Sequence, residues 1–150
     1  MTPNELKIEN SMKVVFNARK KDLPCDQLHR LFMSVGWSDD CSQNPELLKN
    51  FNKPFINSFL VISAWSNERL VGAVRVLSDK IIRSVIYDLL VDPKYQDKGI
   101  GKELVKRCIE HFPDSEWLVP TTSDKVIYYE KLGFKISKDS FLTIPSKWQK

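Results

Sequence analysis

Cysteine and long apolar runs are the features that this chain most clearly lacks. The 150 residues include 3 cysteines, an odd number, and no pair has CxxC spacing. This excludes a disulfide framework and a thiolate zinc site and indicates reduced thiols. No apolar run approaches the roughly 20 residues that cross a bilayer. The N-terminal residues "MTPNELKIEN" have no signal-peptide core. We therefore expect a cytoplasmic protein with no membrane partner.

Charge and histidine content narrow the function further. The net charge of +4 is mild, so it permits a polyanionic partner without requiring one. No RNA or DNA motif is present, and we expect no nucleic-acid partner. The 2 histidines are isolated in the sequence, and His29 lies off the apolar stripe of its segment, so we expect it at the surface. We expect no metal site.

The order of apolar patterns predicts an α+β fold in a single domain, residues 1–150. It has a central, mixed, mostly antiparallel sheet of about six to seven strands, flanked by about four helices. Strands are expected at 12–16, 58–65, 69–77, 81–91 and 116–120, with two final strands, "FKIS" (134–137) and "FLTI" (141–144). Helices are expected at 22–36, 44–52, 99–112 and 123–133.

The stretch "QDKGIG", residues 96–101, places two of only 5 glycines at the mouth of a helix. A P-loop is excluded because Gly101-Lys102 is followed by Glu103 and the first glycine is missing. A dinucleotide fingerprint is weak because Leu104 stands where the third glycine or alanine belongs. The remaining pattern is QxxGxG between a strand and a helix. Glycine allows backbone N–H groups to approach a ligand closely, and the helix N-terminus favours an anion. A pyrophosphate fits this arrangement, although an ordinary turn into a helix would also fit the spacing alone.

The flanking residues resolve this ambiguity. The segment "YDLLVDPKYQDKGIGKELVKRCIE" resembles the acyl-CoA motif of the GNAT superfamily of N-acetyltransferases, and "VIYYEKLGFK" resembles that family's second signature, FYEKLGF. The two motifs span about residues 85–138. The resemblance implies an acetyl-CoA-dependent N-acetyltransferase that acts on a primary amine of a small molecule or peptide. A catalytically silent acyl-CoA sensor or scaffold stays the alternative, and a homodimer is compatible with either.

The resemblance also assigns residues to the cofactor. It places the pyrophosphate on Gln96, Asp97, Lys98, Gly99, Ile100, Gly101 and Lys102, and the pantetheine arm along the backbone of Leu89, Leu90 and Val91. The general acid falls on Tyr129, while Tyr128 replaces the family's usual Phe. Thr122 stands where many members carry a cofactor-binding Asn, so that contact is not carried over.

Chemistry supports two catalytic candidates. A tyrosine can donate a proton to the departing CoA thiolate, which fits the assignment of Tyr129. Asp88 interrupts the apolar run "VIYDLLV", and a carboxylate in such a strand costs free energy unless it is paired or functional. We therefore keep two interpretations of Asp88, a catalytic or substrate-binding role and an ion pair, the commoner outcome, with Arg75 across the hairpin.

The acceptor pocket is the least defined part of the sequence. In the family it usually lies between the first two helices and the sheet. Trp37 and Phe55 come from that region, and aromatic side chains with the acidic neighbours Asp39 and Asp40 suit an apolar amine or a cation. We take Trp37 and Phe55 as substrate-binding candidates, with core packing as the plain alternative for each. The sequence does not identify the amine.

Overall fold

The computed structural model describes residues 4–8, 12–41 and 43–147 and divides the chain into two compact units, residues 1–120 and 121–150. The strands of the first unit are β1 (Glu5–Ile8), β2 (Met12–Asn17), β3 (Leu60–Ser66), β4 (Arg69–Ser78), β5 (Arg83–Val91) and β6 (Glu116–Leu118). Its helices are α1 (Cys25–Ser34), α2 (Pro45–Lys49), α3 (Lys53–Ile56), the 3-10 turn η1 (Pro93–Tyr95) and α4 (Ile100–His111).

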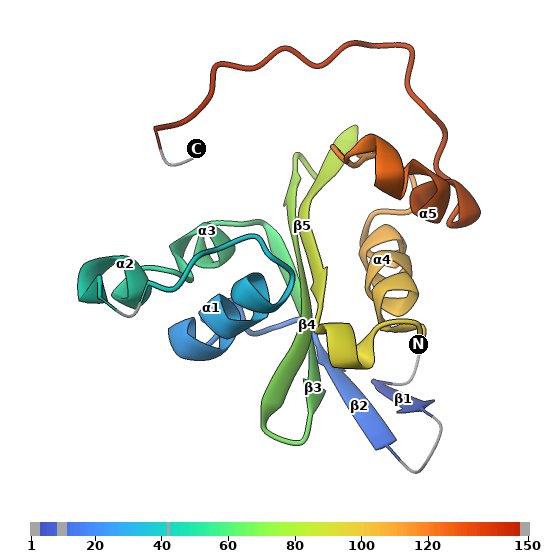
Figure 1. Cartoon of the computed structure of the whole chain (residues 1–150). Coiled ribbons are helices and arrows are strands. Elements are labelled where there is room, and N and C mark those ends of the chain that lie inside the picture. The colour runs from blue at the N-terminus through green and yellow to red at the C-terminus, as the bar shows by residue number, and fades with distance from the viewer. Residues whose placement is uncertain (1–3, 9–11, 42, 148–150) are drawn as a thin grey trace. The chain divides into compact units, whose positions relative to one another are not determined.

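One sheet in the order β1-β2-β3-β4-β5-β6 organises the first unit (Figure 1). Neighbouring strands are antiparallel except β5 and β6, which are parallel. The expected antiparallel meander of three β-rich runs is confirmed as β3, β4 and β5. The mixed, mostly antiparallel α+β architecture is confirmed as well.

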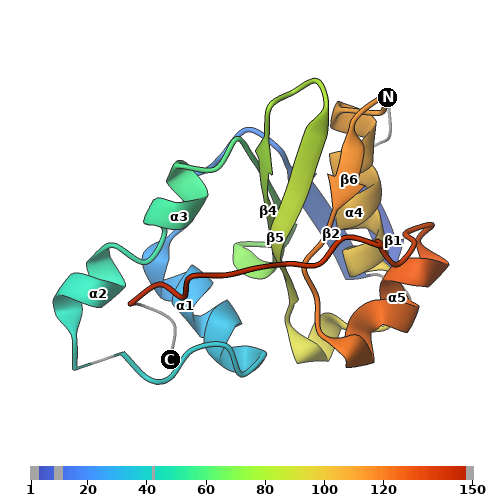
Figure 2. The same ribbon diagram turned by 90° about the horizontal axis from the view of Figure 1, so that it is seen from above.

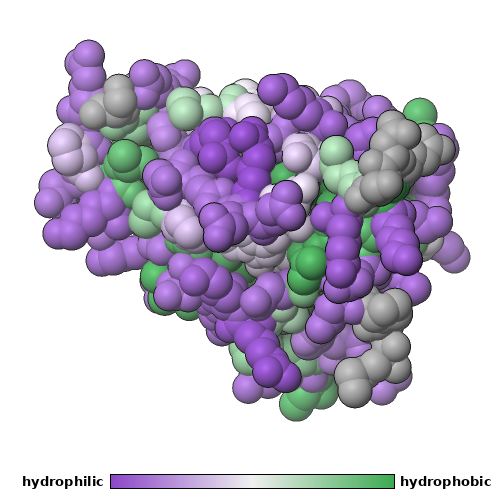
Figure 3. Space-filling view, turned by 90° about the horizontal axis from the view of Figure 1, so that it is seen from below, coloured by the Kyte–Doolittle hydropathy of each residue, from purple (hydrophilic) through white to green (hydrophobic). Residues whose placement is uncertain are grey.

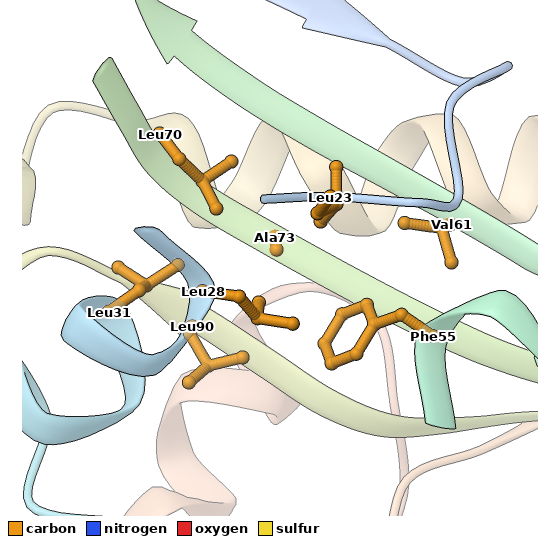
Figure 4. Packing of buried hydrophobic residues seen from close by; sticks show 8 residues of the cluster. All are labelled: Leu23, Leu28, Leu31, Phe55, Val61, Leu70, Ala73 and Leu90. Atoms are coloured by element: carbon orange, nitrogen blue, oxygen red, sulfur yellow. The ribbon is translucent and has the colours of Figure 1, made fainter. Parts of the chain in front are cut away.

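Helices cover both faces of this sheet. In both ribbon views α1 and α3 lie on one side of it and α4 on the other (Figures 1 and 2). Two short helices, α2 and α3, replace the single helix expected at 44–52. On the α1 side, apolar side chains from α1, α3 and the strands meet in one core cluster (Figure 4), made of Leu23, Leu28, Leu31, Phe55, Val61, Leu70, Ala73 and Leu90.

The other face needs a glycine for close packing. A Cβ atom built on Gly72 of β4 would lie 3.3 Å from the side chains of Ile100 and Leu104 and from the carbonyl oxygen of Leu90. Contacts at this distance require the neighbouring atoms to move. Gly72 therefore allows the first turns of α4 to lie directly on the sheet. Cys108 of α4 is also fully buried.

The second unit contains the 3-10 turn η2 (Ser123–Lys125) and the helix α5 (Val126–Lys131). Gly133 ends α5 at φ 99°, with Gly133 N–H donating to Glu130 O and Phe134 N–H to Tyr129 O. These two bonds form a Schellman motif, which favours glycine at this position, and they confirm Gly133 as the helix stop.

The two expected final strands, 134–137 and 141–144, are wrong. The structure assigns no strand to either segment. The side chains of Ile136, Phe141, Leu142 and Ile144 are 68–97% exposed. A strand that neither pairs nor packs gains nothing to offset the loss of conformational entropy, and β-propensity alone did not reveal whether a partner was present.

His29 is also placed differently from the expectation. It is buried, its Nε2 atom lies 3.0 Å from the carbonyl oxygen of Asp39, and its ring meets Phe51 edge-to-face at 5.0 Å. The loop that follows α1 folds back over the helix and covers a position that helical periodicity assigns to solvent.

Candidate functional site

The loop between β5 and α4 is fixed at its start by Asp92. One oxygen of this buried carboxylate accepts from Arg69 at 3.1 Å, and the other accepts from the backbone N–H of Lys94 at 3.0 Å. Gln96 then donates from Nε2 to the carbonyl oxygen of Val91 at 2.9 Å. The glutamine of the motif therefore ties the loop to the end of β5.

Two residues of the loop have left-handed backbone conformations. Asp97 has φ 60° and Gly99 has φ 84°. Gly99 is the N-cap of α4, and no side chain caps the helix. The first intrahelical bond of α4 runs from Glu103 N–H to Gly99 O. This conformation turns the chain sharply into the helix, and only glycine adopts it without a steric penalty.

The turn leaves a row of backbone donors unused. Among the described residues, no hydrogen-bond partner is present for the N–H groups of residues 98–102. These groups stand at the positive end of the dipole of a twelve-residue helix. Lys98 and Lys102 are exposed beside them. Together these groups can bind a doubly charged anion such as a pyrophosphate.

The surface seen from below the view of Figure 1 is mainly hydrophilic, with hydrophobic residues in separate patches (Figure 3). An ionic ligand suits such a surface better than an extended apolar one does.

Strand β5 has an open edge just before the loop. Strand β6 pairs with β5 only at Arg83, Ser84 and Val85, so beyond Val85 this edge has no strand partner among the described residues. The pairing of β5 with β6 thus ends at Val85 and Leu118, before the residues expected to bind pantetheine.

The open edge carries specific backbone groups. Asp92 N–H donates to Val71 O of β4. In an antiparallel pair, successive residues of a strand direct their backbone N–H and C=O groups alternately toward the partner strand and toward the opposite edge. Leu90 therefore also bonds to β4, whereas the N–H and C=O groups of Leu89 and Val91 point to the open edge. The Gln96 contact to Val91 O agrees with this direction. Of the three residues expected to bind pantetheine through the backbone, Leu89 and Val91 face the right way, and Leu90 faces β4 with its side chain in the core.

A β-bulge precedes this edge. Arg75 of β4 pairs with Asp88, but the next residue, Val76, pairs with Ile86, so Tyr87 is an extra residue in β5. Bulges re-aim side chains and interrupt pairing. The sequence "VIYDLLV" does not mark the bulge, because an extra residue changes the register without changing the composition.

Asp88 forms the ion pair that its sequence position suggested. Arg75 Nε donates to Asp88 Oδ2, and the two side chains are 19% and 20% exposed. The Arg75 guanidinium also lies over the rings of Tyr87, at 5.4 Å, and Phe55, at 6.0 Å. The ion pair does not exclude contact with a substrate, because Oδ1 of Asp88 has no partner among the described residues.

The two acceptor candidates have different environments. Phe55 is 1% exposed and belongs to the core cluster, where it supports Arg75. Trp37 is 54% exposed at the end of the α1 segment and meets Phe32 edge-to-face at 6.0 Å. Of the two, only Trp37 presents a ring to solvent in this structure.

In the second unit, Tyr129 is packed between two other rings. Its ring lies 5.2 Å from Tyr128 and 5.6 Å from Phe134, both edge-to-face. Burial, with a smaller contribution from Tyr128, raises the pKa of Tyr129 to about 12. The phenol therefore keeps its proton at neutral pH. Thr122 is engaged locally, since its hydrogen bond to Asp124 is the main cause that lowers the pKa of that carboxyl.

Within the described ranges, no group of three or more His, Cys, Asp and Glu side chains could hold a metal ion. The same part of the chain contains no helix with the length and hydrophobicity needed to span a bilayer.

A mixed sheet with a glycine-bearing strand–loop–helix is typical of an acetyltransferase fold, and the comparisons with known proteins agree. A family model for the acetyltransferase (GNAT) domain matches residues 38–143. An uncharacterised N-acetyltransferase, ycf52, of the alga Pyropia yezoensis is 31% identical over 129 residues, which cover 81% of this chain and 71% of that protein. The chain belongs to the GNAT acetyltransferase family.

Two further sequence relatives are named as different kinds of acetyltransferase. A ycf52-like uncharacterised N-acetyltransferase of Prochlorococcus marinus is 33% identical over 117 residues, or 73% of this chain. A protein of Glycine max named histone acetyltransferase TAP1 is 30% identical over 128 residues, or 76% of this chain. The matched stretches cover only 62% and 53% of these two proteins.

Solved structures confirm the fold. A GNAT-family acetyltransferase of Streptococcus pneumoniae superposes with a TM-score of 0.72 at 21% identity, covering 89% of this chain and 98% of that one. An aminoglycoside acetyltransferase from an uncultured soil sample gives 0.59 at 25% identity, covering 89% and 95%. At these identities the likeness establishes the fold and leaves the acceptor open.

Proposed function

We propose that this protein is an acetyl-CoA-dependent N-acetyltransferase that transfers an acetyl group to a primary amine by direct attack on the thioester. One observation carries the proposal. The open edge of β5 at Leu89 and Val91 leads, through a loop tied back by Gln96, into the unpartnered N–H groups at the start of α4.

The donor side follows from these backbone groups. The pyrophosphate would bind the N–H groups of residues 98–102, with Lys98 and Lys102 adding positive charge. The pantetheine arm would pair with the N–H and C=O groups of Leu89 and with the N–H group of Val91, as a peptide adds a strand to a sheet. Because backbone atoms make most of these contacts, acetyl-CoA affinity should depend on loop geometry more than on side chains.

The transfer itself needs three groups. An edge N–H of β5 would polarise the thioester carbonyl. The amine nitrogen forms a bond to the carbonyl carbon and gives up one proton, which Asp88 Oδ1 would accept, while the C–S bond breaks. The departing thiolate takes a proton from Tyr129, whose role rests on its place in the second sequence motif. With its pKa raised to about 12, the phenol is protonated at neutral pH and has a proton to give.

The acceptor is a small-molecule or peptide amine that enters beside Trp37. Exposed aromatic rings bind apolar groups and cations. Relatives are named for a histone and for aminoglycosides, which makes basic peptides and amino sugars reasonable members of a test panel.

The test has two independent arms. Calorimetry with acetyl-CoA and with CoA measures donor binding. A screen that follows CoA release measures turnover across amino acids, polyamines, aminoglycosides, peptide N-termini and histone-like peptides. Binding with turnover supports the proposal. Binding without turnover on any amine would favour a silent acyl-CoA sensor, and loss of both would contradict the site assignment.

A further inference from the structure

Arg75 is held in place more firmly than a surface ion pair requires. Its Nε donates to Asp88, its guanidinium lies over the rings of Phe55 and Tyr87, and its side chain is 19% exposed. Phe55 itself is fixed in the core cluster. An arginine between two rings and a carboxylate has few other conformations available, so it can fix the position of that carboxylate.

The bulge explains why Asp88 needs such support. The extra residue Tyr87 interrupts the regular β4–β5 register immediately before Asp88, so pairing alone does not determine where the carboxylate points. Asp88 is also the residue directly before Leu89, whose N–H opens onto the free edge of β5. The Arg75 contact occupies Oδ2 and leaves Oδ1 without a partner among the described residues.

From this geometry we infer that Arg75 is the positioning residue for Asp88, holding the carboxylate by Oδ2 so that Oδ1 receives the proton of the attacking amine. The inference rests on the proposed function. Arg75 touches neither the amine nor the thioester and acts only through Asp88. Tyr87, the bulge residue, supports the guanidinium from the exposed side.

The competing explanation is an ion pair that serves stability alone. The chain contains such a pair for comparison. Arg107 and Glu103 of α4 are 11% and 17% exposed and lie 2.9 Å apart, and the Arg107 guanidinium lies over the Phe16 ring at 4.4 Å. Each arginine pairs with a carboxylate and lies over an aromatic ring, but of the two only Arg75 contacts Asp88, the proposed proton acceptor. Arg107→Met is therefore a matched control.

A double-mutant cycle on the purified protein tests the inference. The variants are Arg75→Met, Asp88→Asn, the double variant and Arg75→Lys, with Arg107→Met as control. Each is measured for acetyl-CoA affinity by calorimetry, for thermal midpoint, and for kcat and KM with the best amine from the acceptor screen. The kinetics are run well below the lowest thermal midpoint, and acetyl-CoA stoichiometry reports the folded fraction.

If Arg75 positions Asp88, the changes in kcat across the variants should not follow the changes in stability. Arg75→Met should lower kcat about 10- to 100-fold, because a misplaced catalytic group loses its alignment. Asp88→Asn should lower kcat roughly 10²–10⁴-fold. The double variant should match Asp88→Asn in kcat, because Arg75 has nothing left to position. It should nevertheless be more stable than Arg75→Met, in which a half-buried carboxylate loses its partner. Arg75→Lys should restore part of kcat, and Arg107→Met should lower only the thermal midpoint.

Three results would overturn the inference. Arg75→Met could keep full kcat despite a lower thermal midpoint, which would make the pair structural. The losses of the two single variants could multiply in the double variant, which would mean that Arg75 acts independently of Asp88. Asp88→Asn could turn over normally. Failure of the proposed function looks different, because the wild-type protein would then release no CoA with any amine, and the inference would fall with it.

Discussion

Gly99 offers the sharpest test of the donor site, because the chain contains a matched glycine elsewhere. Gly99 has φ +84° and Gly36 has φ +78°, and a Cβ on either residue would meet no atom within 4 Å. Gly36 follows α1 and Gly99 precedes α4, and of the two only Gly99 lies in the loop between β5 and α4. The variants Gly99→Val and Gly36→Val should therefore share a conformational cost and differ in ligand binding.

The magnitudes follow from the backbone. A side chain in the left-handed region costs about 1–2 kcal/mol, and somewhat more when it is β-branched. Both variants should lose about this much unfolding free energy. At Gly99 the loop can relieve the strain only by turning its N–H groups away from the ligand. A hydrogen bond to a charged group contributes about 1.5–3 kcal/mol, so losing one should weaken CoA binding roughly 10- to 100-fold.

Calorimetry with CoA and urea unfolding are the assays. Equal losses of stability with a loss of CoA affinity only in Gly99→Val would support the pyrophosphate assignment. Gly101→Val adds a strain-free comparison, since Gly101 is helical and valine is the better helix former by a few tenths of a kcal/mol. It should weaken CoA binding by steric hindrance without an αL penalty. Unchanged CoA affinity in both loop variants would refute the assignment.

Three further predictions concern packing and the tyrosines. Gly72→Ala should cost about 1–3 kcal/mol of stability through overpacking against α4 and also weaken CoA binding, measured by urea unfolding and calorimetry; a neutral result would mean that α4 shifts freely. Tyr129→Phe should lower turnover roughly 10²–10⁴-fold at nearly constant stability and acetyl-CoA affinity, while Tyr128→Phe stays near wild type in steady-state kinetics. Loss of turnover in Tyr128→Phe but not in Tyr129→Phe would exchange the roles of the two tyrosines. Unchanged turnover in both variants would exclude a tyrosine as the acid that protonates the thiolate. Because the pKa of Tyr129 is raised from 10.0 to about 12 in the folded state, its stabilising contribution is complete below about pH 10 and is lost as the pH rises toward about 12. Urea unfolding of wild type and Tyr129→Phe at about pH 9 and about pH 11 should show a steeper loss for wild type, and parallel losses would contradict the shift.

The donor half of the site was predictable from sequence because it depends on local signals. A glycine that needs a left-handed conformation, a helix without a side-chain cap and an apolar strand before them are all readable within twenty residues. In the structure Gly99 has a left-handed conformation at the start of α4, and Gln96 donates to the carbonyl oxygen of Val91. It also assigns the open-edge groups to Leu89 and Val91 instead of Leu90, a distinction that depends on the hydrogen-bonding phase of the strand and has no sequence signal.

Other features depend on contacts between distant segments. Tyr87 becomes a bulge only because β4 and β5 change register there, and Gly72 is required only because α4 packs on β4. His29 is buried by a loop that returns over α1. A weak signal existed for Gly72, since an isolated glycine within an apolar strand often marks a close approach.

The donor side and the acceptor side of the candidate site consequently differ in how well sequence similarity predicts what each one binds. In the proposed function, backbone groups at the β5 edge and the α4 N-terminus would bind the part of acetyl-CoA that every acetyl transfer shares, so donor binding would depend on the fold of the loop more than on particular side chains. The acceptor side is built from side chains, with Trp37 exposed on one segment and Arg75 and Asp88 on two strands. We expect a single substitution there to change the amine without disturbing the fold. Relatives at 30–33% identity can therefore share the donor while their acceptors differ. In the proposed mechanism, the amine of this protein's acceptor would have to reach Asp88 Oδ1.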